Sequence, residues 1–280
     1  MKPALSQVCS LHSPFDQDVI DYAAGACHSI ELWLGKLETW LDKHPLDDVR
    51  RLMAEHEVEF PVASYQGGLL ASQGDARRQH WQHFHRRLDL CRQLNVQTLV
   101  VACDIAEPPQ PATLDRIRLS LVQAAQAAGE AGLRLALEFQ ARSTLGNNLQ
   151  TAAALVGETA SPHLGLCLDV FHYYAGPSKF EDLAYLSPAN LFHVQFSDVT
   201  EIARELAADG DRILPGDGDF QLGPIVEVLA AIAYDGYVSV ELMNPQIWRI
   251  PARQFGEIAM TALRKVLGQA SMGKEMMKEE

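Results

Sequence analysis

The chain alternates short apolar runs with longer amphipathic or alanine-rich stretches. The four later runs are rich in Leu, Val and Phe and are bounded by Gly, Pro, Asn or Asp, a pattern typical of strands buried on both faces. The runs lie near residues 5–11, 28–34, 57–63, 96–102, 133–139, 164–170, 190–196 and 236–242. Between most of them the pattern predicts helices, for example over 76–94, 113–130 and 221–233. This alternation predicts an α/β protein with a parallel sheet.

Eight predicted strands are the number found in a (β/α)8 TIM barrel, which is the fold we predict. A doubly wound open sheet is the main alternative, but it usually carries a glycine fingerprint after its first strand, and SLHSPFDQD contains none. No linker divides the 280 residues, and one barrel can reach this size. We therefore expect a single barrel over residues 1–270, with a last helix near 252–268, and a charged, flexible tail over 271–280.

The overall charge disfavours two classes of partner. The formal net charge is −13 and the sequence pI is about 5.2, with no cluster of Lys and Arg to attract nucleic acid or an anionic membrane. The first residues contain no long apolar segment of the kind found in signal peptides, and no stretch reaches the length of a membrane helix. We therefore expect a cytoplasmic protein with no nucleic-acid or membrane partner.

The cysteines do not suggest a disulfide framework or a zinc ribbon. Their number is odd and no two stand at a short paired spacing. Two of them lie within apolar runs and a third directly follows one, so we expect reduced and mostly buried thiols. The five cysteines are Cys9, Cys27, Cys91, Cys103 and Cys167.

Polar side chains stand at or near the ends of the last four apolar runs, from residue 133 onward. They are Glu138 in LRLALEF, Asp169 in LGLCLDV, Gln195 in LFHVQF and Glu241 in YVSVEL. The carboxyl ends of barrel strands meet at one face, where the active sites of TIM barrels lie. Carboxylates gathered there need a cation, so the pattern predicts a metal site. A structural network of carboxylates paired with arginines is the alternative.

Several motifs resemble those of the xylose-isomerase-like TIM barrel family. They are LEF at Glu138, LDVFH at 168–172, HVQFSD at 193–198, RILPGDGDF at 212–220 and GYVSVELMNPQIW at 236–248. The resemblance covers nearly the whole chain and is most specific over 133–250. This family includes sugar isomerases and epimerases, inosose dehydratases and isomerases, and dehydroshikimate dehydratases. The resemblance implies a divalent metal held by Glu, Asp, His and Glu.

The expected histidine ligand is the point where this chain departs from the family pattern. Family members commonly read His-x-His on the seventh strand and use the second histidine, whereas this chain reads His193-Val194-Gln195. A carboxamide oxygen from Gln195 would make the ligand set Glu138, Asp169, Gln195 and Glu241 all oxygen, which suits Mn²⁺ or Mg²⁺. Another divalent metal stays open, as does His193 as the fourth ligand, although we favour Gln195.

The resemblance implies that Glu138 and Glu241 also transfer protons, from opposite sides of the substrate. Abstraction of the proton next to a metal-bound carbonyl would give an enediolate. We therefore predict a metal-dependent isomerase or epimerase acting on a sugar or cyclic polyol ketone. The first alternative is a dehydratase, a carbon–oxygen lyase of the 3-dehydroshikimate or inosose type. The second is a non-catalytic sugar-binding barrel.

Other polar and aromatic side chains are candidates for catalysis or substrate binding. His172, three residues after Asp169, resembles a family histidine that contacts a substrate oxygen or aids proton transfer, with a structural hydrogen bond as the alternative. The cations after the sixth and seventh strands could bind a carboxylate, a phosphate or a polarised oxygen, or could simply face solvent. The resemblance also leaves room for a homo-oligomer. The candidate substrate-binding residues are Glu31, Lys179, Arg212, His193, Trp248 and His12.

Overall fold

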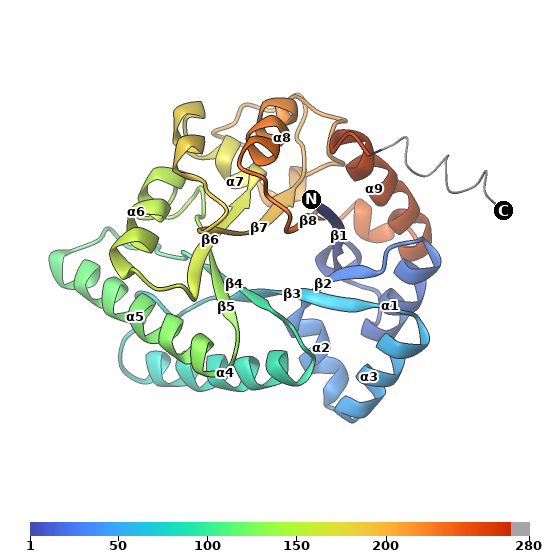
Figure 1. Cartoon of the computed structure of the whole chain (residues 1–280), viewed down its shortest axis with the longest axis horizontal. Helices are drawn as coiled ribbons and strands as arrows, with labels where there is room; N and C mark the ends of the chain where they lie inside the picture. The colour runs from blue at the N-terminus through green and yellow to red at the C-terminus, as the bar shows by residue number, and fades with distance from the viewer. Residues whose placement is uncertain (270–280) are drawn as a thin grey trace. The chain divides into compact units, whose positions relative to one another are not determined.

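The computed structural model describes residues 1–269, so the expected tail over 271–280 lies outside the described residues. Within residues 1–269, eight parallel strands close into a barrel with helices between them, as Figure 1 shows. The predicted (β/α)8 barrel is confirmed. The strands are β1 (Lys2–Ser6), β2 (Ser29–Trp33), β3 (Glu59–Gln66), β4 (Thr98–Ala102), β5 (Arg134–Glu138), β6 (Leu164–Asp169), β7 (Leu191–Phe196) and β8 (Tyr237–Val240).

Helices follow the strands, with short 3₁₀ segments in some loops. The α-helices are α1 (Phe15–Ala24), α2 (Leu34–Leu41), α3 (Leu46–Glu55), α4 (Gly74–Gln93), α5 (Pro111–Glu130), α6 (Leu149–Thr159), α7 (Val170–Ala175), α8 (Leu222–Ala231) and α9 (Ala252–Val266). The 3₁₀ segments are η1 (Gln7–Ser10), η2 (Phe180–Tyr185), η3 (Asp209–Asp211) and η4 (Ile247–Arg249). Over the described residues, no helix has both the length and the apolar character needed to cross a bilayer.

The chain forms two compact units. Within the described residues, the first contains Met1–Ile30, Lys36–Glu59 and residues 196–269, and the second contains Glu31–Gly35 and Phe60–Gln195. In the first unit, β1 and β8 are parallel partners in register, and α9 packs against α1 and β1.

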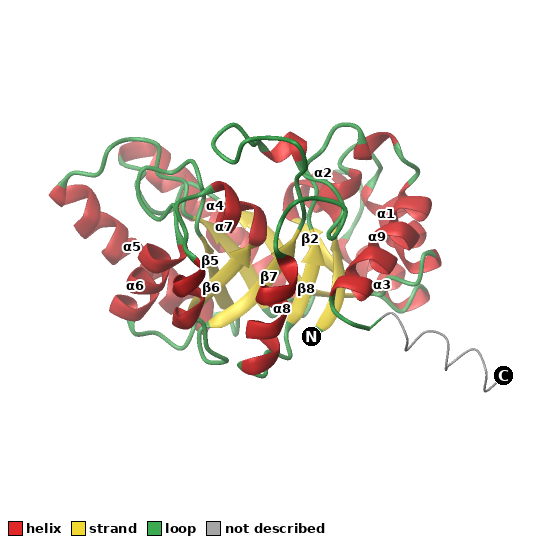
Figure 2. Cartoon of the chain, turned by 90° about the horizontal axis from the view of Figure 1, so that it is seen from above, coloured by secondary structure: helices red, strands yellow, loops and turns green. Residues whose placement is uncertain are grey.

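In the second unit, β4, β5, β6 and β7 are successive parallel neighbours. Helix α5 packs against β5 and α6 against β6, and Figure 2 shows both helices on the outer side of these strands. The registers place Glu138 beside Cys167 and Asp169 beside Gln195. Backbone pairing therefore holds Gln195 directly beside Asp169, and it holds Glu138 on the other side of β6, opposite the residue two positions before Asp169.

Every residue of β4, β6 and β7 is buried, which explains why these strands are continuous apolar runs in the sequence. The predictions for the fourth to eighth strands agree with the structure to within two residues at each end. The first prediction, 5–11, is wrong: the strand is Lys2–Ser6, and Gln7–Ser10 form a buried 3₁₀ turn. The Ser6 hydroxyl accepts a hydrogen bond from the Val8 backbone N–H at 3.5 Å and so favours the turn. An apolar run predicts that a segment is buried but not that it is a strand. Here Gln7–Ser10 are buried outside the sheet.

Candidate metal-binding site

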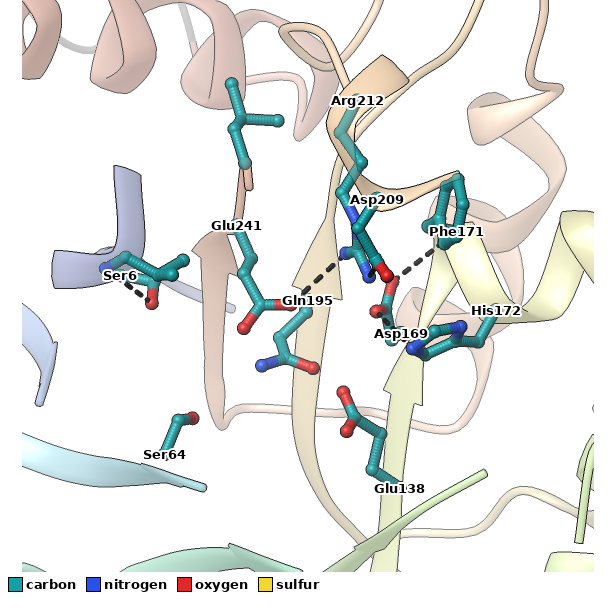
Figure 3. A network of polar contacts seen from close by, with 12 residues as sticks. Ser6, Ser64, Glu138, Asp169, Phe171, His172, Gln195, Asp209, Arg212 and Glu241 are labelled. Carbon is teal, nitrogen blue, oxygen red and sulfur yellow. Dashed lines mark hydrogen bonds and ion pairs between the residues drawn. The ribbon is translucent and has the colours of Figure 1, made fainter. Parts of the chain in front are cut away.

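Three buried side chains of the second unit form a compact acidic cluster. Glu138 ends β5, Asp169 ends β6 and His172 lies on α7. Each offers one possible ligand atom, and these atoms all lie within 4.8 Å of one another. The three residues are 5%, 0% and 6% exposed, respectively. Figure 3 shows the Asp169 carboxylate and the His172 imidazole facing each other, with 3.6 Å between Asp169 Oδ2 and His172 Nε2.

The sequence LDVFH builds half of this cluster by local geometry. Asp169 Oδ1 accepts a hydrogen bond of 2.8 Å from the Phe171 backbone N–H, so the carboxylate caps the start of α7. His172, three residues further on, then lies on the same side of the turn as Asp169. The Ala141 backbone N–H donates to His172 Nδ1 at 3.4 Å, which leaves Nε2 facing Asp169.

Glu138 is positioned by the loop that follows its own strand. The Gln140 side chain donates a hydrogen bond from Nε2 to Glu138 Oε2. The Gln140 backbone N–H in turn donates to the Gly146 carbonyl at 3.1 Å, which ties this residue into the loop. Gln140 therefore fixes one carboxylate oxygen of Glu138 from two residues away.

Glu31, on β2, is the centre of a second buried network in the same unit. It is 0% exposed and accepts hydrogen bonds from the Ser64 hydroxyl, from His193 Nε2 at 3.0 Å and from Gln195 Nε2 at 2.8 Å. The Gln195 oxygen, Oε1, accepts a hydrogen bond from the Cys167 thiol at 3.2 Å. The structure thus brings three predicted site residues, Glu31, His193 and Gln195, into direct contact.

In the first unit, Arg212 pairs with Glu241, the residue that follows β8. The Arg212 guanidinium is 1% exposed and donates from Nη1 to Glu241 Oε2 at 3.2 Å. It also donates from Nη2 and Nε to Asp209 Oδ1, at 2.7 and 3.1 Å. Figure 3 shows the guanidinium directed toward both carboxylates. Arg212 is thus a buried partner of Glu241, and solvent exposure, one of the two alternatives for this cation, is wrong.

The loop over 197–220 is organised around the buried carboxylate of Asp198. Asp198 accepts hydrogen bonds from the backbone N–H groups of Val199 at 2.9 Å, Gly216 at 3.1 Å and Phe220 at 2.9 Å. The backbones of Asp198 and Ile213 also form an antiparallel bridge, which fixes the residue next to Arg212. These hydrogen bonds fix the backbone of the loop on both sides of Arg212. The Arg212 side chain is therefore held in place to contact Glu241.

The remaining candidates lie nearer the surface. In the first unit, the His12 and Trp248 rings meet edge to face with centroids 5.0 Å apart, and Trp248 Nε1 donates to the Val8 carbonyl at 2.7 Å. In the second unit, Lys179 is exposed, and its backbone N–H is held by Asp182 at 2.8 Å. The pairing of His12 with Trp248 joins two candidates that are far apart in the sequence.

Sequence reasoning did not single out four residues that support the site through hydrogen bonds. Their partners stand at irregular or very long spacings along the chain, which give no periodic signal. One weak signal is the position of Asp209 three residues before Arg212, a spacing at which an acid and an arginine can pair. The four residues are Gln140, Ser64, Cys167 and Asp209.

The composition of the acidic cluster fits a divalent cation. Buried carboxylates lose the hydration that stabilises their negative charge. A bound cation compensates for this loss because its positive charge attracts both carboxylates. Carboxylate oxygens are donors that Mn²⁺, Mg²⁺ and related ions accept readily. The structure also places the His172 imidazole beside the two carboxylates expected from the sequence, Glu138 and Asp169.

The five cysteines are buried and take part in no disulfide within residues 1–269, as expected from their spacing. Burial raises the pKa of the Cys27 and Cys103 thiols to about 12 in each case. These two groups therefore stay protonated near neutral pH and are poor metal ligands.

Comparison with known proteins agrees with the barrel and with the motifs. Residues 20–265 match the xylose isomerase-like TIM barrel family. An inosose isomerase of Bacillus velezensis is 26% identical over 254 residues, which are 88% of this chain and 87% of that protein. A 3-dehydroshikimate dehydratase of Pseudomonas aeruginosa is 28% identical over 215 residues, which are 74% of this chain but 33% of that longer protein.

A solved structure is similar over almost the whole chain. The crystal structure of IolI protein with a zinc atom has a TM-score of 0.89 and 23% sequence identity, and covers 96% of this chain and 99% of its own. This likeness supports the barrel fold. The family match spans most of the described barrel, including both acidic residues of the cluster. The chain therefore belongs to the xylose isomerase-like TIM barrel family.

Proposed function

We propose that this protein is a divalent-metal-dependent isomerase or epimerase of a sugar or cyclic polyol ketone, working by proton transfer next to the carbonyl. The observation that carries the proposal is the buried cluster of Glu138, Asp169 and His172 within 4.8 Å, at the carboxyl ends of neighbouring strands. The identity to an inosose isomerase over 88% of the chain supports a cyclic polyol ketone as the substrate class.

The proposed metal ligands are Glu138, Asp169, Gln195 and Glu241, with Mn²⁺ or Mg²⁺ as the cation. Glu138 and Asp169 support this set by their proximity, and Gln195 by its register position beside Asp169. Glu241 follows β8 directly and so lies at the carboxyl end of a barrel strand, where the active sites of TIM barrels are found. IolI carries zinc, whereas a carboxamide oxygen in the ligand set favours the harder cations here. When bound, the cation would polarise the substrate carbonyl and stabilise negative charge on its oxygen.

Glu138 and Glu241 are the proposed acid–base pair. Gln140 holds Glu138 Oε2 and Arg212 holds Glu241 Oε2, so each carboxylate has one oxygen fixed by a hydrogen-bond donor. A carboxylate fixed in this way accepts a proton at a defined place, as a general base requires. Return of the proton to the neighbouring carbon isomerises the substrate, and return to the opposite face epimerises it.

His172 is the proposed hydrogen-bond donor to a substrate oxygen. Its Nδ1 accepts a bond from the Ala141 backbone N–H at 3.4 Å, so a neutral ring carries its proton on Nε2, the nitrogen that faces Asp169. Among the other candidates, Arg212 and Lys179 would bind polar substrate groups, and Trp248 with His12 would offer a ring surface. Glu31 and His193 are fully buried, and their hydrogen bonds give them a supporting role around Gln195.

A dehydratase is the second candidate, because a 3-dehydroshikimate dehydratase is among the relatives. The same proton abstraction followed by departure of a β-hydroxyl group would give a conjugated product. Ultraviolet absorbance of that product would distinguish the dehydratase from the isomerase.

Proton exchange measured by NMR tests the proposal. The protein with Mn²⁺ or Mg²⁺ in D₂O is offered ketoses, inososes and dehydroshikimate, and loss of the signal from the proton next to the carbonyl is followed. We expect exchange that stops when a chelator is added or when Glu138→Gln is used. Metal-bound protein that exchanges no proton of any such compound would leave a sugar-binding barrel as the better interpretation.

A further inference from the structure

The buried Glu31 carboxylate is shared by donors from two different strands of the second unit. Gln195 Nε2 and the Ser64 hydroxyl both donate to Oε1, and His193 Nε2 faces Oε2 at 3.0 Å. Glu31 and His193 are 0% exposed and Gln195 is 1% exposed. Hydrogen bonds to a carboxylate in so dry a place are strong, so they hold their donors firmly.

The Gln195 carboxamide lies between two neighbours of opposite hydrogen-bonding character. Its Nε2 donates to Glu31 at 2.8 Å, and its Oε1 accepts from the Cys167 thiol at 3.2 Å. A carboxylate only accepts hydrogen bonds, whereas a thiol donates one. A rotation of the carboxamide by half a turn would place Oε1 against the Glu31 carboxylate and Nε2 against the thiol proton. Glu31 therefore selects one of the two orientations.

In the selected orientation the oxygen points to the acidic cluster. Figure 3 shows the Gln195 oxygen on the side of Glu138 and Asp169, with the nitrogen turned away from them. The backbone register independently places Gln195 beside Asp169 on the neighbouring strand. A carboxamide can bind a cation only through its oxygen, so orientation decides whether Gln195 is a ligand.

We propose that Glu31 is a positioning residue that orients Gln195 for metal binding: it holds Nε2 and so presents Oε1 to the cation. This inference rests on the proposed function, in which Gln195 is a metal ligand. It assigns to Glu31 the task that an acidic partner performs for a metal-bound histidine in many proteins, here applied to a carboxamide.

Replacement of Glu31 by glutamine tests the orientation directly. Glu31→Gln keeps the size of the side chain but can both donate and accept, so both orientations of Gln195 become available. We expect the affinity for Mn²⁺, measured by electron paramagnetic resonance of the free ion, to fall by about 10–100-fold. The matched control is Ser64→Ala, which removes a different donor from the same Glu31 oxygen and should change the affinity by less than about 3-fold.

A double-mutant cycle separates orientation from a general structural effect. In a Gln195→Ala background there is no carboxamide to orient, so Glu31→Gln should lower the Mn²⁺ affinity little further. Equal losses in both backgrounds would overturn the proposal. If wild-type protein and Gln195→Ala bind Mn²⁺ equally well, the inference fails together with the assignment of Gln195 as a ligand, while the proposed metal-dependent proton transfer stands. If wild-type protein binds no Mn²⁺, the proposed function itself fails.

A measurement on the wild-type chain covers the case in which Glu31→Gln does not fold. The side-chain amide signal of Gln195, in protein labelled with ¹⁵N-glutamine, should shift when Mg²⁺ is added, because coordination of the oxygen polarises the amide. The amide proton that is donated to Glu31 should exchange slowly with solvent before and after addition. An unshifted signal at saturating Mg²⁺, or rapid exchange in the metal-bound protein, would overturn the proposal.

Discussion

Two buried acidic groups in this chain are stabilised in different ways. In the first unit, the Asp18 carboxylate pairs with the Lys36 ammonium group and accepts a hydrogen bond of 2.8 Å from the Ser10 hydroxyl. In the second unit, the Glu138 and Asp169 carboxylates lie close to each other and to His172. One region places a cation of the chain against its acid, whereas the other gathers acid with acid.

The difference separates a structural network from a binding site. A buried carboxylate that faces an ammonium group is partly compensated within the fold, although the pair's net contribution to stability can be small. Two buried carboxylates within reach of one another repel, and the arrangement becomes favourable when a cation enters from solution. Burial alone therefore does not identify a functional carboxylate. A neighbouring cation of the chain indicates a structural role, whereas neighbouring carboxylates indicate a site for a bound cation.

The largest effect we expect is on proton exchange by Glu138→Gln. This change removes a proposed proton-transfer group and a proposed metal ligand, so exchange of substrate protons in D₂O should fall by about 10²–10⁴-fold. Gln140 provides the comparison, because it holds the Glu138 carboxylate but is itself neither a proposed proton-transfer group nor a proposed metal ligand. Gln140→Ala should lower exchange by less than the loss of Glu138 itself.

The same variant sharpens the comparison through stability. Without metal, Glu138→Gln removes a negative charge next to Asp169, so its thermal midpoint should equal or exceed that of the wild type. Asp18→Asn should instead lower the midpoint, because Lys36 keeps its buried charge without its carboxylate. If both substitutions destabilise the metal-free protein equally, the distinction between the two regions is wrong.

The next largest effect should follow from Lys36→Met. The Asp18 side chain is 0% exposed and that of Lys36 is 9% exposed, so this change leaves a buried carboxylate without its ammonium partner. Loss of one partner from a buried pair costs about 3–5 kcal/mol of unfolding free energy. Urea denaturation at pH 7 measures this loss. The double variant Asp18→Asn/Lys36→Met should recover most of it, and failure to recover would show that Lys36 acts through packing alone.

Asp18 should also make stability depend on pH. Burial raises the pKa of Asp18 from 3.8 to about 6, against the lowering effect of Lys36 and two serine hydroxyls. The folded state therefore binds this proton more tightly than the unfolded chain does. The resulting stabilisation is complete below about pH 4 and is lost as the pH rises through about 6. The shift corresponds to about 3 kcal/mol.

Urea denaturation of the wild type and Asp18→Asn between pH 4 and pH 7 measures this contribution. The unfolding free energy of the wild type relative to the variant should fall by up to about 3 kcal/mol as the pH rises over this range. Curves that stay parallel from pH 4 to pH 7 would show that Asp18 titrates as it does in the unfolded chain.

Part of this comparison was predictable from the sequence. The ends of β5 and β6 were placed correctly because each strand is a continuous apolar run, so Glu138 and Asp169 could be expected as neighbours. His172 was singled out because it resembles a histidine of the family, three residues after Asp169 in the LDVFH motif. The shift of β1 to Lys2–Ser6 was missed, since Val8 and Cys9 are as buried in a 3₁₀ turn as they would be in a strand.

The partners of the polar side chains were not predictable in the same way. Glu31 contacts His193 and Gln195, which are 162 and 164 residues away along the chain, and nothing periodic marks such pairs. The same holds for Arg212. The sequence predicted a surface cation or a substrate-binding cation, and it did not predict that Arg212 is buried against Glu241. Strand register and loop folding decide these contacts, and both depend on the whole barrel.

The smallest effect we expect is the stabilisation of the protein by Mn²⁺. A ligand that binds only the folded state adds about 2.7 kcal/mol to the unfolding free energy at one hundred times its dissociation constant. The thermal midpoint should therefore rise with Mn²⁺ and return when a chelator removes the ion. Asp169→Asn should abolish the rise, whereas Asp18→Asn should retain it in full, because Asp18 already has Lys36 as its cation. An equal response of both variants to Mn²⁺ would mean that the ion binds elsewhere, and that gathered acids in the second unit are no better a metal site than a paired acid in the first.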